Sequence, residues 1–83
     1  MFKVYLLYSE KKGKFYIGKT SDILEERIRR HNTNHKGFTG GVLDWRLVHS
    51  ETFSDDKSAS QREKELKLWK SSRRLRRLAG MEI

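Results

Sequence analysis

Two runs near the N-terminus place their side chains on alternating faces, and this pattern constrains the fold more than any other feature. The first run, residues 2–8, carries four bulky side chains on one face: Phe2, Val4, Leu6 and Tyr8. Residues 14–18 repeat the alternation, and the polar connection at residues 10–13 ends in Gly13. Such alternation is typical of half-buried strands, and glycine readily adopts the positive φ of a hairpin turn. We therefore expect an antiparallel hairpin.

The following segment changes to a helical period. Residues 21–32 predict a helix, in which Asp22 and Glu25 have the spacing of a capping box. The apolar side of this helix consists of Ile23, Leu24 and Ile28. Residues 32–41 contain three glycines and predict a loop. Renewed alternation in residues 45–53 predicts a third strand.

Two further helices complete the expected fold. After a turn at residues 54–57, a helix begins at Ser58, and its buried stripe comprises Ala59, Arg62, Leu66 and Trp69. Residues 73–79 predict a short third helix, which Gly80 closes. The order ββαβαα predicts an α+β fold, in the form of an α/β sandwich with a small, three-stranded, mainly antiparallel sheet flanked by three helices.

The size and composition of the chain limit its organisation. With 83 residues, of which 35% are hydrophobic, it can form one compact core, so we expect a single domain over residues 1–83. The absence of cysteine excludes disulfides and thiolate metal sites, and it fits a reducing compartment. No apolar run approaches the roughly 18 residues of a membrane span, and the N-terminus lacks the form of a signal peptide. We therefore expect a cytoplasmic protein with no membrane partner.

The charge balance indicates a polyanionic partner. Nineteen Lys and Arg residues against eleven Asp and Glu residues give a net charge of +8. A surplus of this size attracts nucleic acid, because each cation that neutralises a phosphate releases condensed counterions. The alternative is a domain whose surface is merely basic, and charge alone predicts no chemistry.

The hairpin brings two tyrosines together. Whether the turn contains two residues or four, odd positions of the first strand face the same way as even positions of the second. Tyr5 and Tyr16 therefore share a face, and Lys3 points to the same side. The opposite face carries Val4, Leu6, Phe15 and Ile17. The structural alternative is an aromatic pair that only adds about 0.2–1 kcal/mol to the stability of the sheet.

The two longer helices add charged groups that suit a phosphodiester. Arg27 and His31 are four residues apart, so both lie on one side of the first helix. Arg27 could equally be a solvated phosphate contact on a basic helix. In the second helix, Glu63 and Glu65 flank the buried stripe, and one carboxylate there could bind a divalent cation that keeps several waters. The spacing leaves open which of the two does so. Structural or solvent-exposed roles are expected for the remaining histidines, His35 and His49.

Four separated motifs, in this order, resemble the GIY-YIG nuclease domain. They are Val4-Tyr5, Tyr16-Ile17-Gly18, Arg27 with His31, and Arg62-Glu63-Lys64 followed by Lys67 and Trp69. The resemblance runs from Val4 to about Leu78. It is closest to the short single-domain members that are related to the catalytic module of the bacterial excision-repair incision subunit. The first motif departs from the family pattern, because Lys3 replaces its glycine and Val4 its isoleucine.

The resemblance implies a catalytic site and a cofactor. It assigns the catalytic residues as Tyr5, Tyr16, Arg27, His31 and Glu63. Glu63 would bind a single Mg²⁺ or Mn²⁺ ion, and Arg27 would stabilise the charge of the transition state. Tyr5 would take a proton from the attacking water. A phenol with a pKa near 10 is a poor base at neutral pH, so Tyr5 would need the help of a second group, for which His31 is the natural candidate.

The implied function is that of a metal-dependent endonuclease that cuts DNA with low sequence specificity, with a role in repair or recombination. RNA is an alternative substrate. Basic side chains would hold the phosphate backbone, and those expected to do so are Lys3, Lys19, Arg30, Lys67, Lys70, Arg73, Arg74, Arg76 and Arg77. Two other functions compete with this one: a non-catalytic nucleic-acid-binding module with the same fold, and a small basic ribosome-associated factor.

Overall fold

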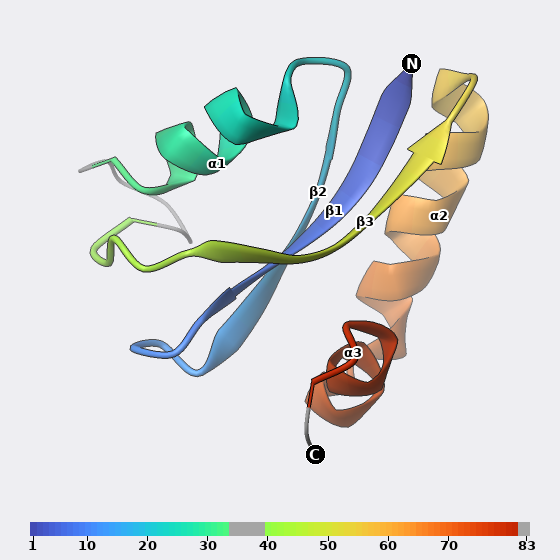
Figure 1. Ribbon diagram of the computed structural model, residues 1–83. Coiled ribbons are helices and arrows are strands. Elements are labelled where there is room, and N and C mark those ends of the chain that lie inside the picture. The colour runs from blue at the N-terminus through green and yellow to red at the C-terminus, as the bar shows by residue number, and fades with distance from the viewer. Residues whose placement is uncertain (34–39, 82–83) are drawn as a thin grey trace.

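A three-stranded antiparallel sheet forms the centre of the protein in a computed structural model, which describes residues 1–33 and 40–81. The strands are β1 (Phe2–Ser9), β2 (Lys14–Thr20) and β3 (Arg46–Phe53), in the spatial order β2-β1-β3. The helices are α1 (Leu24–His31), α2 (Asp56–Trp69) and α3 (Ser72–Leu78). In Figure 1, α1 covers one face of the sheet, while α2 and α3 lie on the other. The order ββαβαα and the α+β class are as predicted.

The β1–β2 hairpin has the longer of the two turns that the sequence allowed. Ser9 pairs with Lys14, so residues 10–13 form a four-residue connection. Its last residue, Gly13, has a φ of +63°. Tyr5 pairs with Gly18 and Leu7 with Tyr16. The two tyrosine rings therefore lie on one face, with their centroids 6.3 Å apart, which confirms the expected parity.

Strand β1 differs from the half-buried strand that its alternation predicted. All six residues from Val4 to Ser9 are buried. The strand is central, because β2 and β3 pair with its two edges, and helices cover both of its faces. One core, beneath α1, contains Tyr5, Leu7, Leu24 and Trp45. The other core, beneath α2, is built around Val4, Ala59 and Leu66.

Both expected helix starts are wrong by two or three residues. Helix α1 begins at Leu24, its N-cap is Ile23, and no side chain caps it. The capping-box prediction fails because Asp22 lies in the preceding bend, where its N–H donates to Thr20 Oγ1 at 3.0 Å. Ile23 is not part of the buried apolar side of this helix, since 66% of its surface is exposed.

Helix α2 begins at Asp56 rather than at Ser58. Its N-cap is Asp55, whose Oδ1 accepts the Ser58 N–H at 2.7 Å. A carboxylate at this position satisfies one of the N–H groups that the first helical turn leaves without a partner. Residues 54–57, interpreted from sequence as a turn, thus include the N-cap and the first two residues of the helix.

Strand β3 contains an irregularity that alternation could not predict. Leu6 pairs with His49 but Leu7 pairs with Leu47, so Val48 is an extra residue at a bulge. Trp45 lies just before the strand, with 3% of its surface exposed, and packs into the core beneath α1. Most of the expected loop at residues 32–41, including His35, lies outside the described residues. None of the helices in the described part of the chain has the length and apolar character that crossing a bilayer requires.

Candidate active site

The ring of Tyr5 lies directly across Gly18 of the neighbouring strand. A Cβ atom added at Gly18 would stand 2.4 Å from both Cζ and Oη of Tyr5, far inside any real contact distance. No φ in the left-handed region is involved, so the requirement for glycine here is one of space. The phenol occupies the volume that any side chain at position 18 would fill.

His31 completes a cluster of three rings on this face. Its Nε2 lies 2.9 Å from Tyr5 Oη in a buried hydrogen bond, and its ring centroid lies 4.6 Å from that of Tyr16. Only 8% of the surface of His31 is exposed. As the last residue of α1, His31 reaches the sheet because Leu24 and Ile28 pack that helix onto the same core. Which atom donates depends on the tautomer of the imidazole.

Arg27 stands one turn before His31 and acts on the same phenol. Burial raises the pKa of Tyr5 above its usual 10.0, and this effect outweighs the hydrogen bond and positive charge of Arg27, which lower it. Among the described residues, Arg27 Nε is the one buried side-chain nitrogen or oxygen without a hydrogen-bond partner. A buried donor of this kind costs stability unless an acceptor reaches it, and an anionic oxygen would be the strongest acceptor.

Glu63 approaches the cluster from α2, in the opposite helix layer. Its negative charge contributes to the raised pKa of Tyr5. The side chain is 22% exposed, and its Oε2 lies 3.2 Å from Lys67 Nζ, one helical turn further on. Glu65 is directed elsewhere: its Oε1 accepts from Arg62 Nη1 at 2.6 Å. The two carboxylates that the spacing could not separate are thus distinct in position and partners.

The donor set at Glu63 fits only certain metal ions. The described residues contain no group of three or more His, Asp or Glu side chains that could bind one together. Glu63 alone suits Mg²⁺, which commonly binds one or two carboxylates and keeps waters and substrate oxygens as its other ligands. Mn²⁺ accepts the same kind of oxygen donors. A closed, all-protein site is not formed by these residues.

Arg62, the residue before Glu63, has a structural role in this fold. Its Nε and Nη2 donate to the two carboxylate oxygens of Glu51 at 2.9 and 3.1 Å, which ties α2 to β3. His49 Nε2 also lies 2.8 Å from Glu51 Oε2, in agreement with the structural role expected for His49. Burial would raise the pKa of Glu51, but hydrogen bonds from Arg62 and His49 lower it overall.

The nine cations expected to bind nucleic acid are not gathered on one face. Arg30 is exposed on α1, whereas the cations of the C-terminal segment belong to α2, α3 and their junction on the other side of the sheet. Besides Lys67, which pairs with Glu63, three of these cations are engaged within the protein, each with a polar, charged or aromatic partner. Lys19 Nζ contacts Asp56 and Ser60 at 2.6 Å, Arg76 donates to Tyr8 Oη at 2.9 Å, and Arg74 lies over Trp69 at 4.1 Å.

The remaining six differ in exposure. Lys3 is half-buried and pairs with Thr20 in the sheet. It is two residues from Tyr5 on β1 and therefore lies on the same face, as the sequence predicted. Five are exposed, although Lys67 also contacts Glu63: Arg30, Lys67, Lys70, Arg73 and Arg77.

The sequence did not predict the role of one residue beside the site. Asn32, interpreted only as the start of a loop, bonds through its side-chain amide to both main-chain groups of Trp45. Because it directly follows His31, this contact fixes the end of α1 that carries the imidazole. Asparagine is typical at helix ends, but its long-range partner has no local signal in the sequence.

The chain matches the model of a known protein family. The model of the family described as the GIY-YIG catalytic domain matches residues 1–76 of the 83. Neither the curated proteins nor the solved structures give a significant match.

Proposed function

The chain belongs to the GIY-YIG family, whose domains are typically nucleases, and on this premise we propose that it is a divalent-metal-dependent endonuclease that hydrolyses DNA phosphodiester bonds. The observation that carries the proposal is the arrangement around Tyr5. A buried hydrogen bond joins Tyr5 Oη to His31 Nε2, and the buried Nε of Arg27 lacks a partner one helical turn away. A module that only binds phosphate could also use the Arg27 donor, but it would have no need of the buried phenol–imidazole pair.

The pair Tyr5–His31 would activate the attacking water. Because burial raises the pKa of Tyr5, the phenol stays protonated at neutral pH and cannot act as a base alone. With His31 Nε2 at 2.9 Å, the phenol can take the water proton while its own proton passes to the imidazole. The resulting hydroxide would attack phosphorus, and the bond to the leaving oxygen would break.

Arg27, and Glu63 through the metal ion that it holds, would stabilise the negative charge that develops in this reaction. A non-bridging oxygen of the phosphodiester would accept a hydrogen bond from Arg27 Nε, so the charge that builds up in the transition state meets a buried, fixed donor. Glu63 would hold the single Mg²⁺ or Mn²⁺ ion, which when bound supplies Lewis-acid stabilisation of the phosphate and the leaving oxygen. Tyr16, whose ring contacts the His31 ring, would orient the imidazole.

The substrate proposal rests on charge and on the resemblance. A net charge of +8 favours a polyanion, and contacts made by Lys and Arg to phosphates carry no sequence information. We therefore propose low sequence specificity and a role in DNA repair or recombination. A non-catalytic nucleic-acid-binding module remains the second candidate, since it would need the same basic surface.

A plasmid-relaxation assay tests the proposal. Supercoiled DNA reports single nicks, so wild type, Glu63→Gln and Glu65→Gln would each be incubated with Mg²⁺, Mn²⁺ or EDTA. We expect wild type and Glu65→Gln to nick in either metal, and Glu63→Gln and all EDTA samples to leave the plasmid supercoiled. Equal DNA binding without nicking by any protein would favour the binding module. Equal nicking by wild type and Glu63→Gln would contradict the assignment of Glu63.

A further inference from the structure

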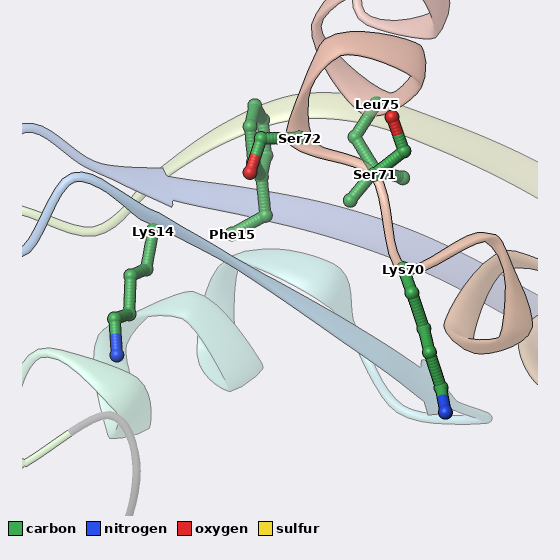
Figure 2. Close-up of a pocket in the computed structure, with 6 residues that line it drawn as sticks. All are labelled: Lys14, Phe15, Lys70, Ser71, Ser72 and Leu75. Carbon is green, nitrogen blue, oxygen red and sulfur yellow. The ribbon is translucent and has the colours of Figure 1, made fainter.

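An open groove lies beside the start of β2, outside the cluster around Tyr5. Its volume is about 290 Å³, and it is lined by Lys14, Phe15, Lys70, Ser71, Ser72 and Leu75. Figure 2 shows the ring of Phe15 standing between β2 and α3, with Ser72 beside it and Leu75 nearby. Lys14 and Lys70 stand at opposite ends, and both ammonium groups point away from α3. We call this cavity the β2-edge groove.

The β2-edge groove lies along the same sheet edge as the candidate catalytic residues. β2 is an edge strand, and Lys14 precedes Tyr16 by two residues, which is about 7 Å along the strand on the same face. On the helix side, Lys70 is the C-cap of α2, and Glu63 lies about two turns, or 10 Å, earlier along that helix. Both walls of the groove therefore lead back to the candidate active site.

The lining of the groove matches the parts of one nucleotide. Phe15 and Leu75 provide an apolar floor, two serines provide hydroxyl groups, and the charged lining residues, Lys14 and Lys70, are both cations. A phosphate would be attracted to the ammonium groups, and a base or sugar would cover the apolar floor. Bases in a duplex are stacked on their neighbours and cannot enter such a groove, so its shape favours an unpaired nucleotide.

We propose that the β2-edge groove binds an unpaired nucleotide of the DNA strand close to the bond that is cleaved, which would direct the enzyme to branched rather than fully paired DNA. The inference rests on the proposed function, because it takes the cleaved bond to lie at Glu63 and Tyr5. It adds the substrate class, which neither the charge of the protein nor its family membership defines.

Binding of two DNAs in the non-cleaving Glu63→Gln background tests the inference. One DNA is a fork with unpaired arms, and the other is a fully paired duplex of the same length. The groove variant is Lys14→Ala with Lys70→Ala. The control is Lys57→Ala with Lys64→Ala, which removes the same charge from exposed positions on the outer side of α2. Affinities would be measured by fluorescence anisotropy at several salt concentrations, with circular dichroism to verify folding.

We expect the control variant to lower the affinity for both DNAs equally. The groove variant should lower the affinity for the fork more than the affinity for the duplex. On the unpaired arm, the slope of log affinity against log salt should fall by about 1.4, because two phosphate contacts are lost at about 0.7 each. Ser72→Trp, which fills the groove without removing charge, should also weaken the fork selectively. The inference is wrong if the groove variant and the control have the same ratio of fork to duplex affinity. This result is independent of nicking, so the inference and the proposed function can fail separately.

Discussion

Asn32 binds Trp45 through both of its side-chain polar atoms. Its Nδ2 donates to the Trp45 carbonyl oxygen and its Oδ1 accepts the Trp45 N–H, each at 2.8 Å. The main-chain N–H of Asn32 donates to the carbonyls of Ile28 and Arg29 and so ends α1. One residue thus joins the end of α1 to the start of β3, immediately after His31. Trp45 in turn packs edge-on against Tyr16, with ring centroids 6.5 Å apart.

This contact predicts that Asn32 positions His31. Asn32→Ala should lower the free energy of unfolding by about 1–3 kcal/mol, because two part-buried main-chain groups lose their partners. It should also lower kcat, with little change in KM, at a temperature where the variant is fully folded. Urea unfolding and steady-state nicking at several DNA concentrations measure the two effects. Thr33→Ala, one residue further on, serves as the control, since Thr33 Oγ1 donates within the helix end, to Arg30 O. Equal kcat in both variants would contradict the positioning role.

The close approach of Tyr5 to Gly18 gives a second prediction. In Gly18→Ala the new Cβ would overlap Tyr5 Cζ and Oη, so the phenol must move and its hydrogen bond to His31 must break. A displacement of about 1 Å at reacting groups can cost on the order of 100-fold in rate. We expect a loss of this size in single-turnover nicking, with DNA affinity retained.

Gly13→Ala is the matched control for that experiment. Gly13 has a φ of +63°, and a Cβ atom added there would have no atom within 4 Å, so alanine strains the backbone and touches nothing. It should cost roughly 1 kcal/mol of stability and leave the nicking rate unchanged. If Gly13→Ala lost as much activity as Gly18→Ala, general destabilisation would explain both.

The spacing of residues in the sequence predicted those features of the fold that depend on residues close together in the chain. The parity of the hairpin placed Tyr5 and Tyr16 on one face whatever the turn length, and the i, i+4 spacing placed Arg27 with His31. The burial of that face was not predicted, because the apolar residues that cover it come from α1 and from the segment before β3 that contains Val42 and Trp45. The choice between Glu63 and Glu65 likewise depends on β3, whose Glu51 holds Arg62 and, through it, Glu65.

The ion pair between Lys67 and Glu63 predicts a competition with metal. Lys67 Nζ lies 3.2 Å from Glu63 Oε2, so an incoming cation must displace it. Exposed pairs of this kind contribute about 0–1 kcal/mol, which corresponds to up to roughly fivefold in affinity. Lys67→Met should therefore lower the Mg²⁺ concentration for half-maximal nicking by up to roughly this factor, measured at saturating DNA. The control, Lys64→Met on the outer side of α2, should leave this Mg²⁺ concentration unchanged. If Lys67→Met also leaves it unchanged, the ammonium group of Lys67 does not compete with Mg²⁺.

The Arg62–Glu51 pair predicts a loss of stability in acid. The pKa of Glu51 lies below the usual 4.5, because the hydrogen bonds from Arg62 and His49 outweigh its burial. A carboxyl group with a lowered pKa stabilises the fold above its unfolded pKa, and this contribution is lost as the pH falls through the folded value. Urea unfolding from pH 6 to about pH 3 should show a smaller decrease for Glu51→Gln than for wild type. Parallel curves would show that Glu51 does not contribute.

Tyr5 predicts the opposite dependence at high pH. Its pKa is raised above 10.0, chiefly by burial and against the effect of Arg27, so the folded protein retains a proton that the unfolded chain releases. The sign follows from linkage: this contribution to stability is complete below pH 10.0 and is lost as the pH rises through the folded pKa. The free energy of unfolding of wild type should therefore fall more steeply between pH 9 and about pH 11 than that of Tyr5→Phe, which carries no ionisable phenol. Because both proteins share every lysine, the difference between their curves isolates Tyr5. Curves with the same slope would show that the phenol is as easily ionised in the folded protein as in the unfolded chain, and would contradict the raised pKa of Tyr5.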